Sequence, residues 1–147
     1  MSLSLRDWVQ NGWLTEHRSS REEIRNLLGI ADRDLRACQI KDLDPDWRFA
    51  IAYNAALQSA TAALAATGHR PARDSHHYRV IESLELTIRA DAELVRQFDA
   101  FRKKRNISSY ETSGAISDRE AQEMRALAAT LREQVERWIR SHHPELI

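Results

Sequence analysis

The sequence predicts an all-α protein, folded as an up-and-down bundle of five to six helices. In several segments apolar residues recur in steps of three and four, which places them on one face of a helix. Ser20 with Glu23, and Ser117 with Glu120, have the spacing of a capping box, which marks the start of a helix. No segment alternates convincingly between apolar and polar residues, so no strand is predicted.

The N-terminal third is expected to hold two helices. A short amphipathic helix from Leu5 to Leu14 would cap the bundle, within residues 1–18. The helix that begins after Ser20 carries a single apolar stripe, made by Ile24, Leu27, Leu28, Ala31, Leu35 and Cys38. Because Cys38 lies on this stripe, we interpret it as a small core residue and not as a nucleophile.

The segment from Pro45 to Thr67 is predicted to be the central helix. Asp44 suits the N-cap position, and Pro45 suits the first helical position. Between Phe49 and Gly68 the chain has no charged residue and is rich in alanine. A helix without a charged face is usually surrounded by protein, and small side chains let its neighbours approach closely. We therefore expect this helix at the centre of the bundle or in part of a dimer interface, with Gly68 ending it.

The C-terminal half is expected to hold three further helices, capped by Ser75, Asp91 and Ser117. The apolar positions of the first two are Val80, Ile81, Leu84 and Ile88, followed by Leu94, Val95, Phe98 and Phe101. The last helix runs through Ile139, and Pro144 excludes its continuation.

Length and composition limit the classes of function. At 147 residues, the chain fits a single domain with its own core. Lys plus Arg and Asp plus Glu number 22 each, so the net charge is zero and any anion-binding site must be a local patch. No stretch is long and apolar enough to span a membrane, and the N-terminus does not resemble a signal peptide. A single cysteine forms no internal disulfide, so we expect a cytoplasmic protein without a membrane partner.

Residues 101–110 contain such a local patch, ahead of the expected helix end near Gly114. Its polar members are Arg102, Lys103, Lys104, Arg105, Asn106 and Tyr110. Cations at the C-terminus of a helix complement the negative end of its dipole, which alone could explain them. A partner that carries phosphate would explain them as well. These six residues are therefore the candidate binding residues.

Arg105 continues the apolar stripe of its helix. The stripe has intervals of four, three and four residues, and consists of Leu94, Phe98, Phe101 and Arg105. A guanidinium that faces the core needs an anionic or hydrogen-bonding partner. Glu82, Glu85 or a backbone carbonyl could serve, and Arg105 would then hold the following turn in place. The alternative is a role toward a ligand or an interface.

Three pieces of the sequence resemble the HEPN superfamily, small helical bundles found mainly in prokaryotes, over roughly Asp44 to the C-terminus. The first resembles the family's Ala-rich helix with a central aromatic residue, and the second the start of the next helix. The third resembles the signature loop and the closing helix. In this chain the pieces are residues 49–57, 75–81, and 105–110 together with 117–138.

In catalytic HEPN proteins, the signature is an Arg, a polar residue and a His a few positions further on. Two such motifs meet across a dimer and form a metal-independent ribonuclease site. Arg105 and Asn106 match the first two positions, whereas Tyr110 stands where the His is expected. His suits proton transfer near neutral pH, whereas Tyr has an ordinary pKa of about 10. If the protein is an enzyme, these three residues are the catalytic candidates.

The resemblance therefore implies a homodimeric binding or regulatory module, with a cleft at the dimer interface that binds the phosphate of a nucleotide or RNA. One alternative is a metal-independent endoribonuclease of toxin type. Another is a protein-interaction partner of a nucleotidyltransferase. We expect no cofactor and no metal site, because neighbouring histidines on a helix (His76 and His77, His142 and His143) point about 100° apart. Capping or surface roles are favoured for them.

Overall fold

The computed structural model describes residues 3–73, 76–110 and 115–147, with the backbone alone at 107–110. Six α-helices occur in these parts of the chain, which confirms the predicted all-α bundle. They are α1 (Leu5–Gln10), α2 (Arg21–Ala37), α3 (Pro45–Ala66), α4 (His76–Glu82), α5 (Ala92–Tyr110) and α6 (Asp118–His142). Shorter elements are the strands β1 (Leu14–Glu16) and β2 (His69–Pro71), and the 3-10 helices η1 (Ser83–Glu85) and η2 (Pro144–Leu146).

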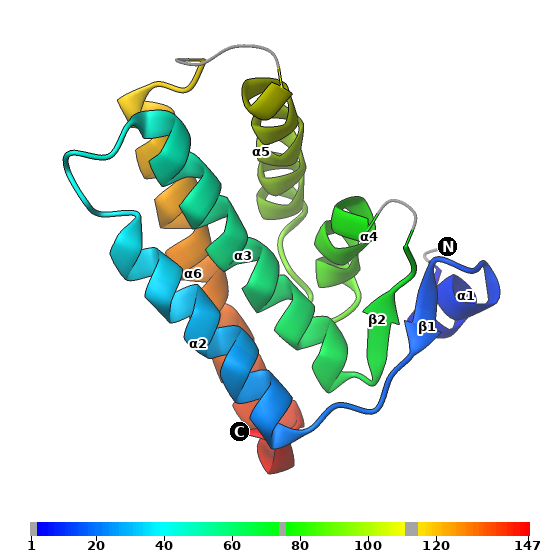
Figure 1. Ribbon diagram of the computed structural model, residues 1–147. Coiled ribbons are helices and arrows are strands. Elements are labelled where there is room, and N and C mark those ends of the chain that lie inside the picture. The colour runs from blue at the N-terminus through cyan, green and yellow to red at the C-terminus, as the bar shows by residue number, and fades with distance from the viewer. Residues whose placement is uncertain (1–2, 74–75, 111–114) are drawn as a thin grey trace.

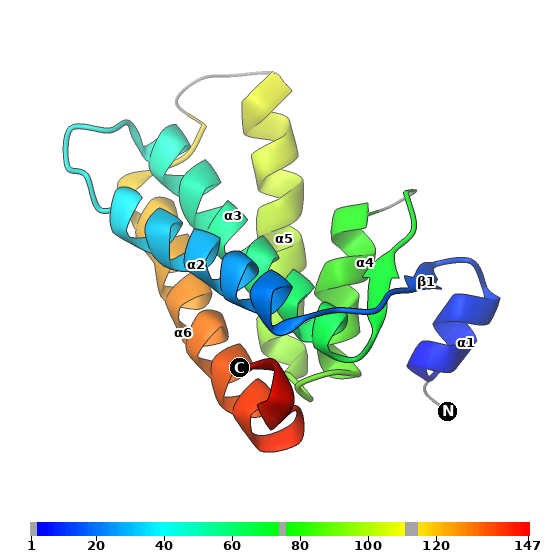
Figure 2. The ribbon, with the colours of Figure 1, turned by 60° about the horizontal axis from the view of Figure 1, so that its bottom comes forward.

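Helix α3 lies at the centre of the bundle, as its uncharged sequence predicts. It packs against α2 and α6 on one side and against α4 and α5 on the other (Figures 1 and 2). Six of its alanines have no exposed surface: Ala52, Ala55, Ala56, Ala60, Ala62 and Ala63. Their small side chains explain how so many neighbours approach one helix. Gly68 follows with φ of 88°, the left-handed conformation that glycine adopts without strain.

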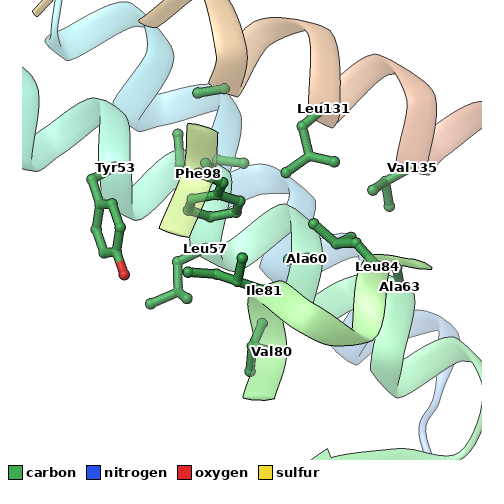
Figure 3. Packing of buried hydrophobic residues seen from close by; sticks show 14 of the residues in the cluster. Tyr53, Leu57, Ala60, Ala63, Val80, Ile81, Leu84, Phe98, Leu131 and Val135 are labelled. Atoms are coloured by element: carbon green, nitrogen blue, oxygen red, sulfur yellow. The ribbon is translucent and has the colours of Figure 1, made fainter. Parts of the chain in front are cut away.

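The core between α3, α4, α5 and α6 is built from the predicted stripe residues. Phe98 of α5 and Ile81 of α4 have no exposed surface, and neither does Leu131 of α6. Figure 3 shows these side chains gathered around α3, with Tyr53 at one edge of the cluster. The rings of Tyr53 and Phe98 meet edge to face, with their centroids 5.7 Å apart. This packing fixes α5 against the middle of α3.

Charged side chains tie α2 to the two helices beside it. Asp34, although buried, accepts a hydrogen bond of 2.7 Å from the amide of Asn54 on α3. Arg132 of α6 donates two hydrogen bonds, of 2.7 and 3.0 Å, to the carboxylate of Asp32. Cys38 follows α2, is buried, and contacts the carbonyl of Leu35 through its sulfur at 3.3 Å. The interpretation of Cys38 as a core residue is therefore confirmed.

The N-terminal segment differs from its prediction. Helix α1 ends at Gln10 instead of Leu14, and Gly12 turns the chain with φ of 78°. Leu14 then begins β1, which pairs antiparallel with β2 so that Leu14 lies opposite Pro71. Leu14 is 1% exposed, whereas the next two residues of β1 are exposed. A strand of three residues is too short to show alternation, so the pattern could not predict it.

The helix after β2 is also shorter than expected. Helix α4 ends at Glu82, and η1 follows it, so the expected continuation to Ile88 is wrong. Arg89 then has φ of 58°, a left-handed conformation that costs a residue other than glycine about 1–2 kcal/mol. The capping role of Asp91 is confirmed, since its carboxylate accepts a hydrogen bond of 3.3 Å from the backbone N–H of Glu93. Ser75 and Gly114 lie outside the described residues.

Candidate functional site

The cationic run of residues 102–105 lies within α5, which continues to Tyr110. The last turn of α5 contains no basic residue, so the dipole explanation for the run is wrong. Arg102, Lys103 and Lys104 form ion pairs with carboxylates of the same chain. Arg102 Nε lies 2.7 Å from Asp99 Oδ1, Lys103 Nζ 3.5 Å from Asp99 Oδ2, and Lys104 Nζ 2.7 Å from Glu120 Oε2.

Lys104 and Lys103 therefore point to different neighbours and do not form one continuous basic surface. Lys104 is held at the start of α6, where its ammonium group is the main cause of a lowered pKa of Glu120. The same carboxylate closes the predicted capping box by accepting from the backbone N–H of Ser117 at 3.0 Å. The structure thus gives Lys104 a structural contact that a phosphate ligand would have to displace.

Arg105 faces inward, as the spacing of its stripe predicts. Phe98 and Phe101 are buried, and Arg105 is half-buried one turn further along the same face. Its guanidinium carbon lies 5.2 Å from the centroid of the Tyr53 ring on α3. A cation over a phenol ring is attracted to the negative face of the π system. The side chain of Arg105 therefore links α5 to the central helix α3.

The Tyr53 hydroxyl brings in a residue that the sequence did not indicate. Its oxygen lies 3.1 Å from Nδ1 of His77, which belongs to the first turn of α4. The two rings are 5.8 Å apart between centroids. The sequence favours a capping or surface role for His77, because nothing in its spacing relates it to a residue 24 positions earlier. The one available signal was Tyr53 itself, since a buried tyrosine usually finds a partner for its hydroxyl.

The two groups have opposite shifts of pKa. Burial lowers the pKa of His77, and the positive charges of His76, Arg105 and Arg102 lower it further. The imidazole is therefore neutral at pH 7. Burial raises the pKa of Tyr53 to about 12, against a weaker effect of Arg105 and Arg102, so the phenol keeps its proton. A neutral imidazole and a protonated phenol can each donate and accept a hydrogen bond beside two guanidinium groups.

Arg102 extends this arrangement toward the N-terminal segment. Its guanidinium carbon lies 5.5 Å from the centroid of the Tyr78 ring, which also contacts Arg79 at 5.2 Å. Arg79 in turn lies 3.7 Å from the centroid of the Trp13 ring. A ladder of alternating rings and guanidinium groups thus joins the turn before β1 to α5. We define the α3–α4–α5 cluster as Tyr53, His77, Tyr78, Arg102 and Arg105.

Acidic side chains lie on one side of the cluster. Asp99 pairs with Arg102, and its negative charge contributes, after burial, to a raised pKa of Glu82. Glu85, one turn later, acts on Glu82 in the same direction. Acidic groups of α4 and α5 therefore neutralise part of the positive charge of the cluster.

The structure does not place the other two candidates, Asn106 and Tyr110, in the cluster. Asn106 is exposed, and the side chain of Tyr110 lies outside the described residues, so its expected place beside Arg105 stays a prediction. Within the described ranges, no three His, Cys, Asp or Glu side chains are close enough to hold a metal ion. No helix of these ranges combines the length and apolar character that crossing a membrane requires.

The described residues form a mostly helical protein, in which cationic and aromatic side chains gather where three helices meet. No protein-family model matches the chain, and no curated protein or solved structure shows significant similarity to it.

Proposed function

We propose that the chain is a HEPN-like binding or regulatory module, and that the α3–α4–α5 cluster binds the phosphate of a nucleotide or RNA. The observation that supports this proposal is the convergence of Arg102 and Arg105 with a neutral imidazole and two phenol rings. Guanidinium groups bind phosphate through two parallel hydrogen bonds. Tyr53 is buried, so the half-buried ring of Tyr78 is the one that could accept a stacked base.

The ion pair between Arg102 and Asp99 is compatible with this role. Asp99 contacts Nε of Arg102, whereas a guanidinium has five N–H donors. The carboxylate therefore orients the guanidinium and leaves its other donors for a phosphate oxygen. The half-buried position of Arg102 and Arg105 strengthens such a contact, because fewer water molecules compete for the donors.

A homodimer belongs to the same proposal. Symmetric pairing is the commonest form of oligomer, and it would bring two copies of α5 to one groove. Arg105 of each copy would then contact the same ligand, which suits a nucleic acid with several phosphates. The oligomeric state in solution, from light scattering, tests this part directly.

Replacing Arg105 by alanine should weaken binding of a fluorescein-labelled RNA oligonucleotide at least tenfold, because a charge-assisted contact to phosphate is lost. Fluorescence anisotropy at low and moderate salt measures the dissociation constant, and fewer phosphate contacts should also reduce its salt dependence. Arg96→Ala is the matched control, since Arg96 lies on the same helix and pairs with Glu93 on the surface. Equal affinities of the two variants, with both folded, would contradict the proposal, and so would a wild-type protein that does not bind.

A second function, RNA cleavage without metal, is favoured by the position of His77. His77 would supply the proton-accepting group in place of the signature His, where this chain has Tyr110. The charges of Arg105 and Arg102 act on the pKa of His77, so it lies near both arginines. If the chain is an endoribonuclease, the purified protein cleaves RNA in EDTA and His77→Gln slows cleavage by about 10²-fold or more.

The pH dependence of cleavage tests whether His77 is the base. A base works in its neutral form, and the lowered pKa of His77 keeps it neutral into the mildly acidic range. Activity should therefore persist below the ordinary pKa of a histidine and fall only at lower pH. His143→Gln is the control, because His143 lies at the far end of α6. RNA that stays intact in EDTA while still binding would leave the binding module as the function.

A further inference from the structure

A separate pocket lies between the chain that joins η1 to α5 and the C-terminal half of α6. Its volume is about 340 Å³, within the range of sites for small ligands. All of the residues that line it are among the described ones, and none belongs to the α3–α4–α5 cluster. Arg89 and Asp91 come from the loop, and Arg137, Trp138 and His142 from α6.

Arg89 occupies a backbone position that suits glycine. Its φ of 58° is the left-handed conformation, and the turn is closed by a hydrogen bond of 3.1 Å from the N–H of Ala90 to the carbonyl of Leu84. Its side chain is exposed and, within the described parts of the chain, has no ion-pair partner. Residues with a strained backbone are found mainly at functional sites. There, the function of the side chain compensates for the free-energy cost of the backbone conformation.

The wall opposite Arg89 combines a cation with a fixed aromatic ring. Arg137 pairs with Glu133 at 3.0 Å on the surface, which engages only part of its guanidinium. The ring of His142 stacks on the indole of Trp138, with centroids 5.5 Å apart and planes inclined by 24°. His142 Nδ1 also donates to the carbonyl of Trp138 at 3.1 Å, so the stack is held by a bond as well. The indole is thus oriented before any ligand arrives.

We propose that this pocket binds a small molecule in which a flat ring carries an anionic group. The ring would contact the indole of Trp138, and the anion would lie between the guanidinium groups of Arg89 and Arg137. Asp91 is the single carboxylate in the lining, and it accepts from the N–H of Glu93 at 3.3 Å, so two guanidinium groups face one carboxylate. This site is independent of the proposed phosphate site.

Two sources of this chemistry are distinguished by the choice of probe. AMP carries a phosphate and indole-3-acetate a carboxylate, and each joins its anion to a flat ring. Titration of the ¹⁵N-labelled protein with either probe, followed through the indole N–H signal of Trp138, reports on this pocket alone. Trp138→Phe identifies that signal among the four tryptophans.

Arg89→Gly gives the decisive variant, because it removes the cation and also relieves the backbone. We expect the dissociation constant for the bound probe to rise at least tenfold while the melting temperature rises. Arg140→Ala, which removes an exposed arginine paired with Glu136 on the same helix, should leave the affinity unchanged. Arg105→Ala should also leave it unchanged, which separates this site from the α3–α4–α5 cluster.

The proposal is supported if either probe shifts the Trp138 signal of the wild type and binds more weakly to Arg89→Gly. Tighter binding of AMP would identify a phosphate ligand, and tighter binding of indole-3-acetate a carboxylate ligand. The proposal is overturned if neither probe shifts the signal, or if Arg89→Gly binds as well as the wild type.

Discussion

Replacement of Phe98 by alanine is expected to lower the free energy of unfolding by about 3–5 kcal/mol, the usual cost of a phenylalanine removed from a core. Phe98 has no exposed surface, and it lies in the cluster formed by α3, α4 and α6 (Figure 3). Its ring also supports Tyr53 from the side, edge to face. The cavity would therefore open beneath the candidate site. Urea unfolding followed by circular dichroism measures the loss.

Gln97→Ala provides the control for this experiment. Gln97 precedes Phe98 on α5 but is exposed, so its truncation should change the free energy of unfolding by less than about 0.5 kcal/mol. A loss below about 1 kcal/mol in Phe98→Ala would mean that α5 does not pack on α3 through this ring. The same variant should weaken RNA binding, because Tyr53 and Arg105 lose their support.

Enlarging Ala60 to leucine should destabilise the protein by about 1–3 kcal/mol, through crowding instead of a cavity. Ala60 has no exposed surface and lies in the same buried cluster (Figure 3). A leucine there can fit only if α3 moves away from the helices around it. The change would show as a lower urea midpoint.

Ala129→Leu is the matched control, because the same atoms are added at an exposed position of α6. It should leave the free energy of unfolding within about 0.5 kcal/mol of the wild type. If Ala60→Leu were equally stable, the central helix would have room beside it, and the small side chains of α3 would need another explanation.

The helices that carry the bundle could be predicted because their signals are local. The caps Ser20 and Ser117 mark the starts of α2 and α6, and in both the Ser hydroxyl accepts from the predicted backbone N–H. The reciprocal half of the box forms at Ser117, whereas the carboxylate of Glu23 contacts His17 instead. The uncharged run of α3 predicts burial on most sides, and most residues of this helix are buried. The strands could not be predicted, because three residues each are too few to show a period, and their pairing joins positions 14 and 71.

In the candidate site, too, local features could be predicted from the sequence and contacts between helices could not. The inward position of Arg105 follows from the spacing of its own helix, and it is confirmed. The approach of His77 to Tyr53 depends on how α4 packs against α3, and the intervening strand and turn give no sign of it. The pair of Lys103 with Asp99 is local, since the two residues lie four positions apart on α5. The pair of Lys104 with Glu120 joins α5 to α6, so it becomes visible only in three dimensions.

The ladder from Trp13 through Arg79 and Tyr78 to Arg102 has a mechanical consequence. Arg79 lies between the ring of Trp13, just before β1, and the ring of Tyr78, its neighbour on α4. The N-terminal segment therefore contacts the helix that bears His77. A change at Trp13 would therefore be expected to reach Arg102 through Arg79 and Tyr78. The N-terminal segment would thereby influence the position of the guanidinium group proposed to bind a ligand.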